Sequence, residues 1–425
     1  MGILLFFFVR EIGMRGIFCV LMQGFCNGLK DKYYLCMLKG EEVKRVLYII
    51  IACLLTACVG TQDFVESGKD MQDWTIFRGS PSLCGYSDCA LPDVPQLLWS
   101  VTTQTRTVAS PIVFNSVVYT LSRKGELRGY TMDGDSCLYH DLKTTVEASF
   151  IAMDTTLFIG RIDGKVTALS LNSHRSTLTP LWEFETLGQI SGSPNLVGDQ
   201  LLVGSYDGSM YTLDNKTGRK MGQFETGYYI NGTAAVWKRY MMFGGCDSWV
   251  RVVDVTTGML TDSLELDTYV PASPAILDGV ACACDYNGNV YEMTLDNGKI
   301  ASHKKLMASS ADNDDQTGGV VSMPTLTREA VYILSGDRNV MCIDRASGQV
   351  RWKKMLRGVT GECSPLVAQD KVLVCTKDGH VSILDCENGT ELWHYETGEP
   401  IIASPAIVAG HFFILTSRGT LLCFG

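Results

Sequence analysis

The sequence predicts an all-β fold, an eight-bladed β-propeller with four-stranded blades whose last blade is closed by an N-terminal strand. The main observation is a fourteen-residue spacing that recurs eight times, from an anchor that is mostly proline to a turn position that is mostly glycine. Successive anchors are 39 to 50 residues apart, so each repeat has a constant interior and a variable connection, as repeated supersecondary units do. The eight pairs are Pro111/Gly125, Phe150/Gly164, Pro194/Gly208, Ala234/Ser248, Pro274/Gly288, Pro324/Arg338, Pro365/Gly379 and Pro405/Gly419.

The interior of each repeat indicates strands in a fixed order. An apolar triplet lies seven to nine residues past each anchor, for example at 201–203, and turn residues bound it, which indicates a buried strand. Asp-Gly or Asn-Gly follows in several repeats, as at 207–208, and predicts a tight hairpin because both central residues must tolerate positive φ. A third strand starts two residues past this turn, and a second turn leads to a fourth. Four strands in about 40 residues are typical of a propeller blade.

The last repeat lacks an outer strand of its own, since residues 421–425 belong to its third strand. A strand-like segment at 96–101 precedes the first anchor, and it carries Trp99 where other outer strands carry a tryptophan. We therefore expect this N-terminal strand to complete the last blade. Closure would remove an open sheet edge that invites aggregation.

At two segments, 343–352 and 384–393, the chain resembles the pyrroloquinoline-quinone (PQQ)-type, quinoprotein-like propeller family. In that family an Asp or Asn, a Ser/Thr/Asn-Gly turn and a Trp recur at fixed spacing, and the Trp packs between neighbouring blades. The fourth and fifth repeats have no aromatic residue in this place, and 74–79 resembles the W-x-x-F-R-G segment found ahead of the propeller in many secreted members. The resemblance implies a structural docking role for Trp99, Trp182, Trp352 and Trp393.

The N-terminal region predicts export and a lipid anchor. Lys44-Arg45 precede an apolar run at 46–55, and Leu55-Thr56-Ala57-Cys58 has the form of a bacterial lipobox. Residues 43–57 are therefore interpreted as a lipoprotein signal peptide, and Cys58 as the acylated first residue of the mature protein. The alternative is a plain signal peptide or a short membrane anchor, although the run is about half of the ~20 residues that a spanning helix needs.

The rest of the chain divides into three further parts. Residues 1–42 are interpreted as an upstream extension outside the native protein, with an additional anchor as the alternative. Residues 58–95 are an arm, and 96–425 are the propeller. We expect the protein in the bacterial cell envelope, lipid-anchored to the outer membrane and facing the periplasm or the cell surface.

The charge and the cysteine content limit the functions that the protein can have. Without residues 1–57 the chain keeps 29 basic and 42 acidic residues, a net charge of −13, which gives no electrostatic basis for binding nucleic acid. The cysteines mostly fall on strand positions and are interpreted as small buried residues. Cys84 and Cys89 lie in the arm instead, where the sequence leaves open whether they form a disulfide.

Candidate catalytic residues are few. Glu147, Asn231 and Glu362 lie just before anchors and are expected beside the channel, and the family resemblance implies that such residues can hold PQQ with Ca²⁺. The paired adjacent cysteines of the quinone enzymes are missing, since the two nearest cysteines here, Cys282 and Cys284, have a residue between them. The six histidines show no ligand spacing, and the acidic segment 312–315 lacks the twelfth-position Glu of a calcium loop. We therefore expect neither a metal site nor a cofactor.

The sequence favours a non-catalytic binding or scaffold protein. Its lipobox and eight repeats resemble the BamB-type lipoproteins of the outer-membrane β-barrel assembly machinery, which implies envelope proteins, and that machinery in particular, as partners. A PQQ-dependent quinoprotein oxidoreductase and a cell-surface carbohydrate- or peptide-binding propeller are the alternatives. The longest step between anchors places an insertion at 308–319, whose Asp312, Asp314 and Asp315 are predicted to meet basic residues of the partner.

Overall fold

The chain forms two compact units, Met1–Val65 and Glu66–Gly425, in a computed structural model. The structure describes residues 73–172, 177–307, 322–359, 361 and 363–425, together with three strands near the N-terminus. These strands, β1 (Leu5–Glu11), β2 (Ile17–Gly24) and β3 (Tyr34–Lys39), make one antiparallel sheet in the order β1-β2-β3. The predicted signal peptide and Cys58 lie outside the described residues. Within the described ranges, no helix has the length and apolar character needed to cross a membrane.

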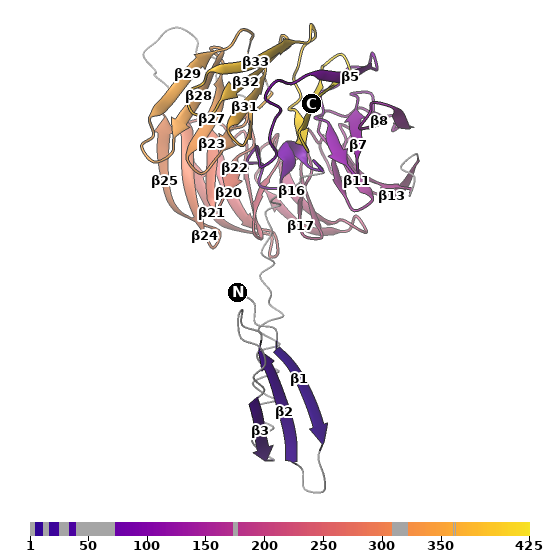
Figure 1. The fold of residues 1–425 in the computed structure, drawn as a ribbon, viewed down its shortest axis with the longest axis vertical. Coiled ribbons are helices and arrows are strands. Elements are labelled where there is room, and N and C mark those ends of the chain that lie inside the picture. The colour runs from indigo at the N-terminus through magenta and orange to yellow at the C-terminus, as the bar shows by residue number, and fades with distance from the viewer. Residues whose placement is uncertain are drawn as a thin grey trace. The chain divides into compact units, whose positions relative to one another are not determined.

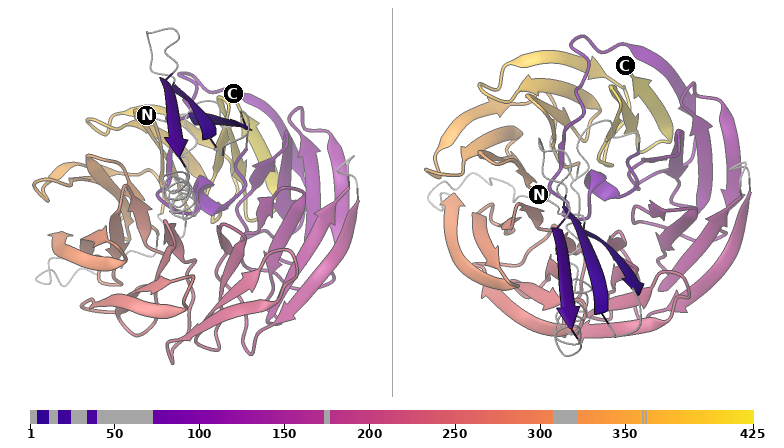
Figure 2. Two further views of the ribbon diagram at one scale, coloured as in Figure 1. Left: turned by 90° about the horizontal axis from the view of Figure 1, so that it is seen from below. Right: turned by 60° about the horizontal axis from the view of Figure 1, so that its bottom comes forward.

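The second unit is a ring of eight blades, each with four antiparallel strands, which confirms the predicted all-β propeller (Figure 1). The sheet of blade 7 has a fifth strand, β4 (Tyr86–Ser87), which pairs parallel with its inner strand. The one described helical element of the second unit is the short 3-10 helix η1 (Phe77–Gly79), which Figure 2 shows inside the ring.

Each sheet runs outward from a short inner strand to an outer strand. The eight blades are as follows: blade 1, β6 (Ile112–Phe114), β7 (Val117–Leu121), β8 (Glu126–Thr131) and β9 (Ser136–Asp141); blade 2, β10 (Ile151–Met153), β11 (Thr156–Gly160), β12 (Lys165–Leu171) and β13 (Leu178–Glu185); blade 3, β14 (Asn195–Val197), β15 (Gln200–Gly204), β16 (Ser209–Asp214) and β17 (Lys220–Glu225); blade 4, β18 (Ala235–Trp237), β19 (Tyr240–Gly244), β20 (Trp249–Asp254) and β21 (Met259–Glu265); blade 5, β22 (Ala275–Leu277), β23 (Val280–Cys284), β24 (Val290–Asp296) and β25 (Lys299–Met307); blade 6, β26 (Thr325–Leu326), β27 (Ala330–Ser335), β28 (Asn339–Asp344) and β29 (Val350–Met355); blade 7, β30 (Leu366–Ala368), β31 (Lys371–Cys375), β32 (His380–Asp385) and β33 (Glu391–Glu396); blade 8, β34 (Ala406–Val408), β35 (His411–Leu415), β36 (Thr420–Phe424) and β5 (Leu97–Thr102).

Blade 8 is closed by the N-terminal strand β5, as the sequence predicts. Strand β5 pairs antiparallel with β36, and Trp99 lies opposite Cys423 in this register. Two further main-chain hydrogen bonds join Gln96 and Gly425, at 2.9 and 3.1 Å. The first and last strands of the propeller therefore share one sheet, and the ring has no open seam at this blade.

The serine that precedes six of the eight anchors explains why Ser-Pro recurs in the sequence. Its hydroxyl oxygen accepts a hydrogen bond from a main-chain N–H of the preceding blade, as Ser149 does from Ser110 (2.8 Å), Ser193 from Ser149 (3.1 Å) and Ser273 from Thr233 (2.7 Å). The same bond runs from Ser364 to Ser404 at 3.2 Å. Because these groups are buried, each bond satisfies a donor that would otherwise be costly to leave unpaired.

Outer-strand tryptophans pack on glycines in the turn between the third and fourth strands of the next blade. Trp182 of blade 2 covers Gly218 of blade 3, and its indole N–H donates to the Asn215 carbonyl at 3.0 Å. Trp352 covers Gly389 in the same way, and its indole N–H donates to the Cys386 carbonyl at 2.9 Å.

The tryptophans at and next to the closed blade also make contacts between blades. Trp99 covers Gly134 of blade 1 and donates to the Met132 carbonyl at 2.7 Å. Trp393 of blade 7 instead packs edge-on against Phe424 of blade 8, with ring centroids 5.4 Å apart.

An aspartate at the end of the third strand shapes the turn that these tryptophans cover. Asp214 Oδ1 accepts hydrogen bonds from the main-chain N–H and the hydroxyl of Thr217, both at 2.8 Å. Asp344 accepts the equivalent bonds from Ser347, at 2.7 and 2.8 Å. These bonds hold the turn so that a left-handed glycine, such as Gly218 with φ +70°, presents a flat surface to the neighbouring blade.

Blade 4 contacts blade 5 through different aromatic residues. It has no outer-strand tryptophan, and Asp262 accepts a hydrogen bond from the Ile300 N–H of blade 5 at 2.9 Å. Trp237 and Tyr240, near the turn between the first two strands, lie instead against Gly279 and Gly298. These two aromatic residues of the first and second strands therefore take the place of the tryptophan, while the outer strands of the two blades remain in contact.

Candidate functional site

The described part of the arm, from Asp73 to the start of β5, runs through the centre of the ring and occupies its channel. Its carbonyl groups accept hydrogen bonds from inner-strand N–H groups of one blade after another, with lengths of 2.9 to 3.0 Å. These donor–acceptor pairs are Val113–Trp74, Ala152–Thr75, Val236–Pro81, Ile276–Ser82, Leu326–Cys84 and Val367–Gly85. Blade 3 contributes the Asn195 side-chain amide, which donates to the Pro81 carbonyl at 2.8 Å. Trp74 belongs to the same buried hydrophobic cluster as Ile407 of blade 8. Inner-strand edges that would otherwise face an open channel are satisfied by this arm.

Arg78 is the most unusual residue of the arm, because its side chain is fully buried. Its Nη2 donates to the Pro324 carbonyl at 2.9 Å and to Thr325 Oγ1 at 2.7 Å, and its Nε donates to the Leu83 carbonyl at 3.0 Å. Burial lowers the pKa of Arg78 to about 10, because the charged form has lost its water. The segment 74–79 therefore lies inside the ring, whereas the sequence indicated only that it precedes the propeller in the chain.

The structure separates the predicted channel residues. Glu147 forms an ion pair with Arg123 in blade 1. Asn231 lies in the connection to blade 4, where its Nδ2 donates to Cys246 Sγ at 3.3 Å and its Oδ1 is buried without a donor among the described residues. Burial raises the pKa of the Cys246 thiol. Glu362, the third candidate, lies outside the described residues.

These residues do not fit a PQQ–calcium site. Calcium takes six to eight oxygen ligands and depends on carboxylates to balance its charge. The carboxylate of Glu147 is already balanced by the guanidinium of Arg123, which would also repel a cation placed beside it. Among the described residues no cluster of three His, Cys, Asp or Glu side chains has metal-site geometry.

Two further predictions concern the acidic insertion and the cysteines of the arm. The acidic residues Asp312, Asp314 and Asp315 of the insertion lie outside the described residues. Cys84 is a buried free thiol whose Sγ lies 3.6 Å from the Ser80 hydroxyl, in the arm within the channel.

An exposed aromatic surface covers one face of the ring over blades 3, 4 and 5. This face, the hairpin face, carries the turns between second and third strands and the connections between blades. Two stacked tyrosine pairs form the surface: Tyr206 with Tyr229, whose centroids are 5.3 Å apart, and Tyr269 with Tyr286, at 4.6 Å. Tyr228 and Tyr229 are 58% and 59% exposed, and Tyr286 is 43% exposed. Large tyrosines left in water on a rigid face are typical of a protein contact.

The loop that carries Tyr228 and Tyr229 is fixed by a threonine at its start. Thr226 donates its hydroxyl hydrogen bond to the Gly208 carbonyl at 3.0 Å and lies 2.7 Å from the Tyr228 carbonyl. Thr186 makes the same pair of contacts in the preceding blade, with Gly164 and Gly188. Tyr228 and Tyr229 therefore project from a turn held by hydrogen bonds, which lowers the entropy lost on binding. The turn positions could be predicted from the repeat, but the stacking of tyrosines from separate turns had no local sequence signal.

The closed ring, the tryptophan–glycine contacts between blades and the inner-strand channel define a quinoprotein-type β-propeller. A family model described as outer membrane protein assembly factor BamB matches residues 133–354 and 308–424 of this chain. The chain belongs to this family.

Individual relatives agree with this assignment. BamB of Legionella pneumophila (strain Paris) is 24% identical over 232 residues, which are 54% of this chain and half of the relative's length. The crystal structure of BamB from Moraxella catarrhalis is similar with a TM-score of 0.64 and 19% identity, covering 78% of this chain and 97% of that one. The quinohemoprotein alcohol dehydrogenase ADHIIG from Pseudomonas putida HK5 gives a TM-score of 0.68 at 14% identity, covering 83% of this chain and 80% of that one. At these identities the two solved structures show a shared fold alone.

Proposed function

We propose that the chain is a non-catalytic scaffold protein of outer-membrane protein assembly. In this proposal it is held in the bacterial envelope by a lipid on Cys58, and a protein of the β-barrel assembly machinery binds its hairpin face. Family membership supports the process, and the lipobox supports the anchor. The observation that carries the binding role is the exposed aromatic surface on fixed turns.

The physical argument for this surface is its composition. Tyrosine buries a large apolar ring at a small entropic loss and keeps a hydroxyl for hydrogen bonding, so it is over-represented among residues that dominate interface energies. Leu187, 92% exposed, adds an aliphatic side chain on a loop whose main chain is bonded to Asp207, next to Tyr206. A partner that covers these side chains would remove apolar area from water without first ordering a flexible loop.

The test is affinity purification of the full chain from bacterial membranes. We expect Tyr229→Ser together with Tyr286→Ser to reduce recovery of the assembly-machinery partner by about tenfold or more. The matched control is Tyr139→Ser, since Tyr139 is 55% exposed on outer strand β9, away from the hairpin face. Equal recovery with all variants would contradict the aromatic surface as the contact.

The acidic insertion is a second proposed contact. Asp312, Asp314 and Asp315 would meet basic residues of the same partner, and such contacts weaken as salt rises. Replacing 308–319 with a short Gly-Ser linker should reduce partner recovery at low salt more than at high salt. Unchanged recovery at both salt concentrations would remove the insertion from the interface.

The quinone alternative has no comparable support. Its candidate Glu147 is paired with Arg123, and the sequence has no adjacent pair of cysteines. The arm also fills the inner part of the channel, along the inner strands. These observations favour a binding role over quinone chemistry.

A further inference from the structure

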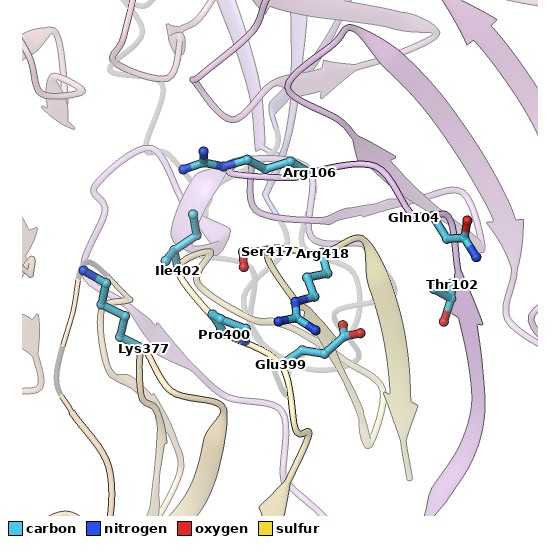
Figure 3. Close-up of a pocket in the computed structure, with 9 residues that line it drawn as sticks. All are labelled: Thr102, Gln104, Arg106, Lys377, Glu399, Pro400, Ile402, Ser417 and Arg418. Atoms are coloured by element: carbon cyan, nitrogen blue, oxygen red, sulfur yellow. The ribbon is translucent and has the colours of Figure 1, made fainter.

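A hollow of about 710 Å³ opens on the hairpin face where blades 7, 8 and 1 meet. Figure 3 shows three long cationic side chains around it, Arg106, Lys377 and Arg418, which come from three separate segments. Arg106 precedes blade 1, Lys377 lies in the hairpin turn of blade 7, and Arg418 lies in that of blade 8. The hollow is separate from the aromatic surface, which lies over blades 3, 4 and 5.

None of the three cations forms an ion pair with a carboxylate of the described residues, whereas other arginines and lysines, together with His380, form the 18 described ion pairs. Three like charges around one hollow repel each other, and an anion between them removes that repulsion. The chain as a whole has a net charge of −10, so this concentration of positive charge runs against its composition.

The main chain beneath the cations is fixed by hydrogen bonds. The Ser417 N–H donates to the Pro400 carbonyl at 2.7 Å, and the Thr107 N–H donates to the Ser417 carbonyl at 3.1 Å. The Lys377 N–H donates to the Val359 carbonyl at 2.7 Å. The side chains therefore extend from rigid positions, and little order has to be gained by the loops when a ligand binds.

The remaining walls define the kind of ligand. Glu399 is the one carboxylate of the lining, and its Oε2 accepts a hydrogen bond from the Thr416 hydroxyl at 2.6 Å. Three cations and one carboxylate leave the lining with two net positive charges. Pro400 and Ile402 add an apolar wall beside the charges. A ligand with a doubly charged anionic group and a carbon part matches this arrangement.

We propose that this hollow binds a phosphate group carried on an organic molecule. The two guanidinium groups offer paired N–H donors that match phosphate oxygens, and the lysine adds a point charge. The phosphate could belong to a small phosphate ester or to the headgroup of a phospholipid, and both sources use the same three cations. The volume is within the range of small-molecule sites.

The experiment measures binding of two probes to the purified full chain at low salt. Glycerol 3-phosphate is titrated by calorimetry, and vesicles of phosphatidylglycerol are compared with vesicles of phosphatidylcholine by co-sedimentation. The test variant carries R106Q, K377Q and R418Q. The control carries K216Q, R219Q and K220Q, which removes the same charge from exposed positions in blade 3 on the opposite face.

We expect the parent and the control to bind, and the test variant to bind at least about tenfold more weakly. Binding of the soluble ester assigns the site to a small molecule, and binding of anionic vesicles alone assigns it to a lipid headgroup. The ester should also raise the melting temperature of the parent and control but not of the test variant. Equal binding by test and control variants, or no binding of either probe by the parent, would overturn the proposal.

Discussion

Single glycines decide how closely neighbouring blades can approach. At Gly218 an added Cβ would lie 2.5 Å from the ring of Trp182, and at Gly389 it would lie 2.6 Å from the ring of Trp352. Both glycines also have positive φ, which an L side chain adopts only with strain. Gly258 has the same place in blade 4 and a φ of +68°, but nothing lies within 4 Å of an added Cβ, because blade 3 has no tryptophan there.

Gly258 and Gly218 form a matched pair for mutation. Gly258→Ala should lower the free energy of unfolding by about 1 kcal/mol, the effect of a left-handed backbone alone. Gly218→Ala should lower it by a further 1–3 kcal/mol or so, because the Trp182 ring has to move. Urea unfolding of both variants measures the difference. Equal losses would show that the tryptophan–glycine contact does not hold blades 2 and 3 together.

The turn aspartates make the free energy of unfolding depend on pH in the acidic range. The N–H of Ser347, and then the guanidinium of Arg351, hold the pKa of Asp344 well below its ordinary value of 3.8. A lowered folded-state pKa means that the stabilisation is complete above about pH 4 and is lost as the pH falls further.

Asp344→Asn should therefore reduce the decline of the urea midpoint between pH 5 and pH 3 relative to the parent. Asp296→Asn, at the exposed last residue of β24 in blade 5, is the control for removal of a carboxylate at the end of a third strand. A parent-like decline in Asp344→Asn would show that this turn contributes nothing to acid sensitivity.

At the scale of elements, strand β5 carries the closure of the ring. Trp99 stacks on Gly134 of blade 1, donates to the Met132 carbonyl and lies 6.0 Å from the Phe413 ring, centroid to centroid. One side chain on the closing strand thus joins blade 8 to blade 1.

Trp99→Ala should lower the free energy of unfolding by about 3 kcal/mol, from lost ring burial and a lost hydrogen bond. The control is Leu98→Ala on the same strand, since Leu98 is 51% exposed and should change stability by less than about 1 kcal/mol. Chemical denaturation of both variants tests this. If the two losses are alike, closure does not depend on Trp99.

The strands could be predicted from the sequence because the repeat supplies eight copies of one signal. Anchor, hairpin and turn spacing define each blade, and the unmatched third strand at 421–425 pointed to β5. No repeated signal predicts the contacts of Trp237 and Tyr240, since these residues take the place of the outer-strand tryptophan in blade 4 only. Periodicity predicts what the blades share, and single departures from it depend on three-dimensional neighbours.

At the scale of the whole molecule, the arm connects the blades through the centre of the ring. Its hydrogen bonds are with residues up to 282 positions away in the sequence, such as Gly85 with Val367, so no local pattern could predict them. The sequence therefore indicates only an arm ahead of the propeller, at 58–95. The aromatic surface was missed for a similar reason, because its tyrosines come from separate turns.

Arg78→Ala should lower the free energy of unfolding by about 3 kcal/mol or more, because it leaves a cavity and three acceptors, on Leu83, Pro324 and Thr325, without their donor. Arg219→Ala, at an exposed residue of blade 3, is the control. Thermal and urea unfolding measure both. A variant as stable as the parent would show that the arm lies in the channel without stabilising the ring through Arg78.

The most direct test of the proposed function is site-specific photocrosslinking in living cells. A photoreactive amino acid at position 229, within the aromatic surface, should crosslink to a component of the β-barrel assembly machinery. The same amino acid at position 139, on outer strand β9, should give no such product. Crosslinking at 139 but not at 229, or to no assembly component from either position, would contradict the account.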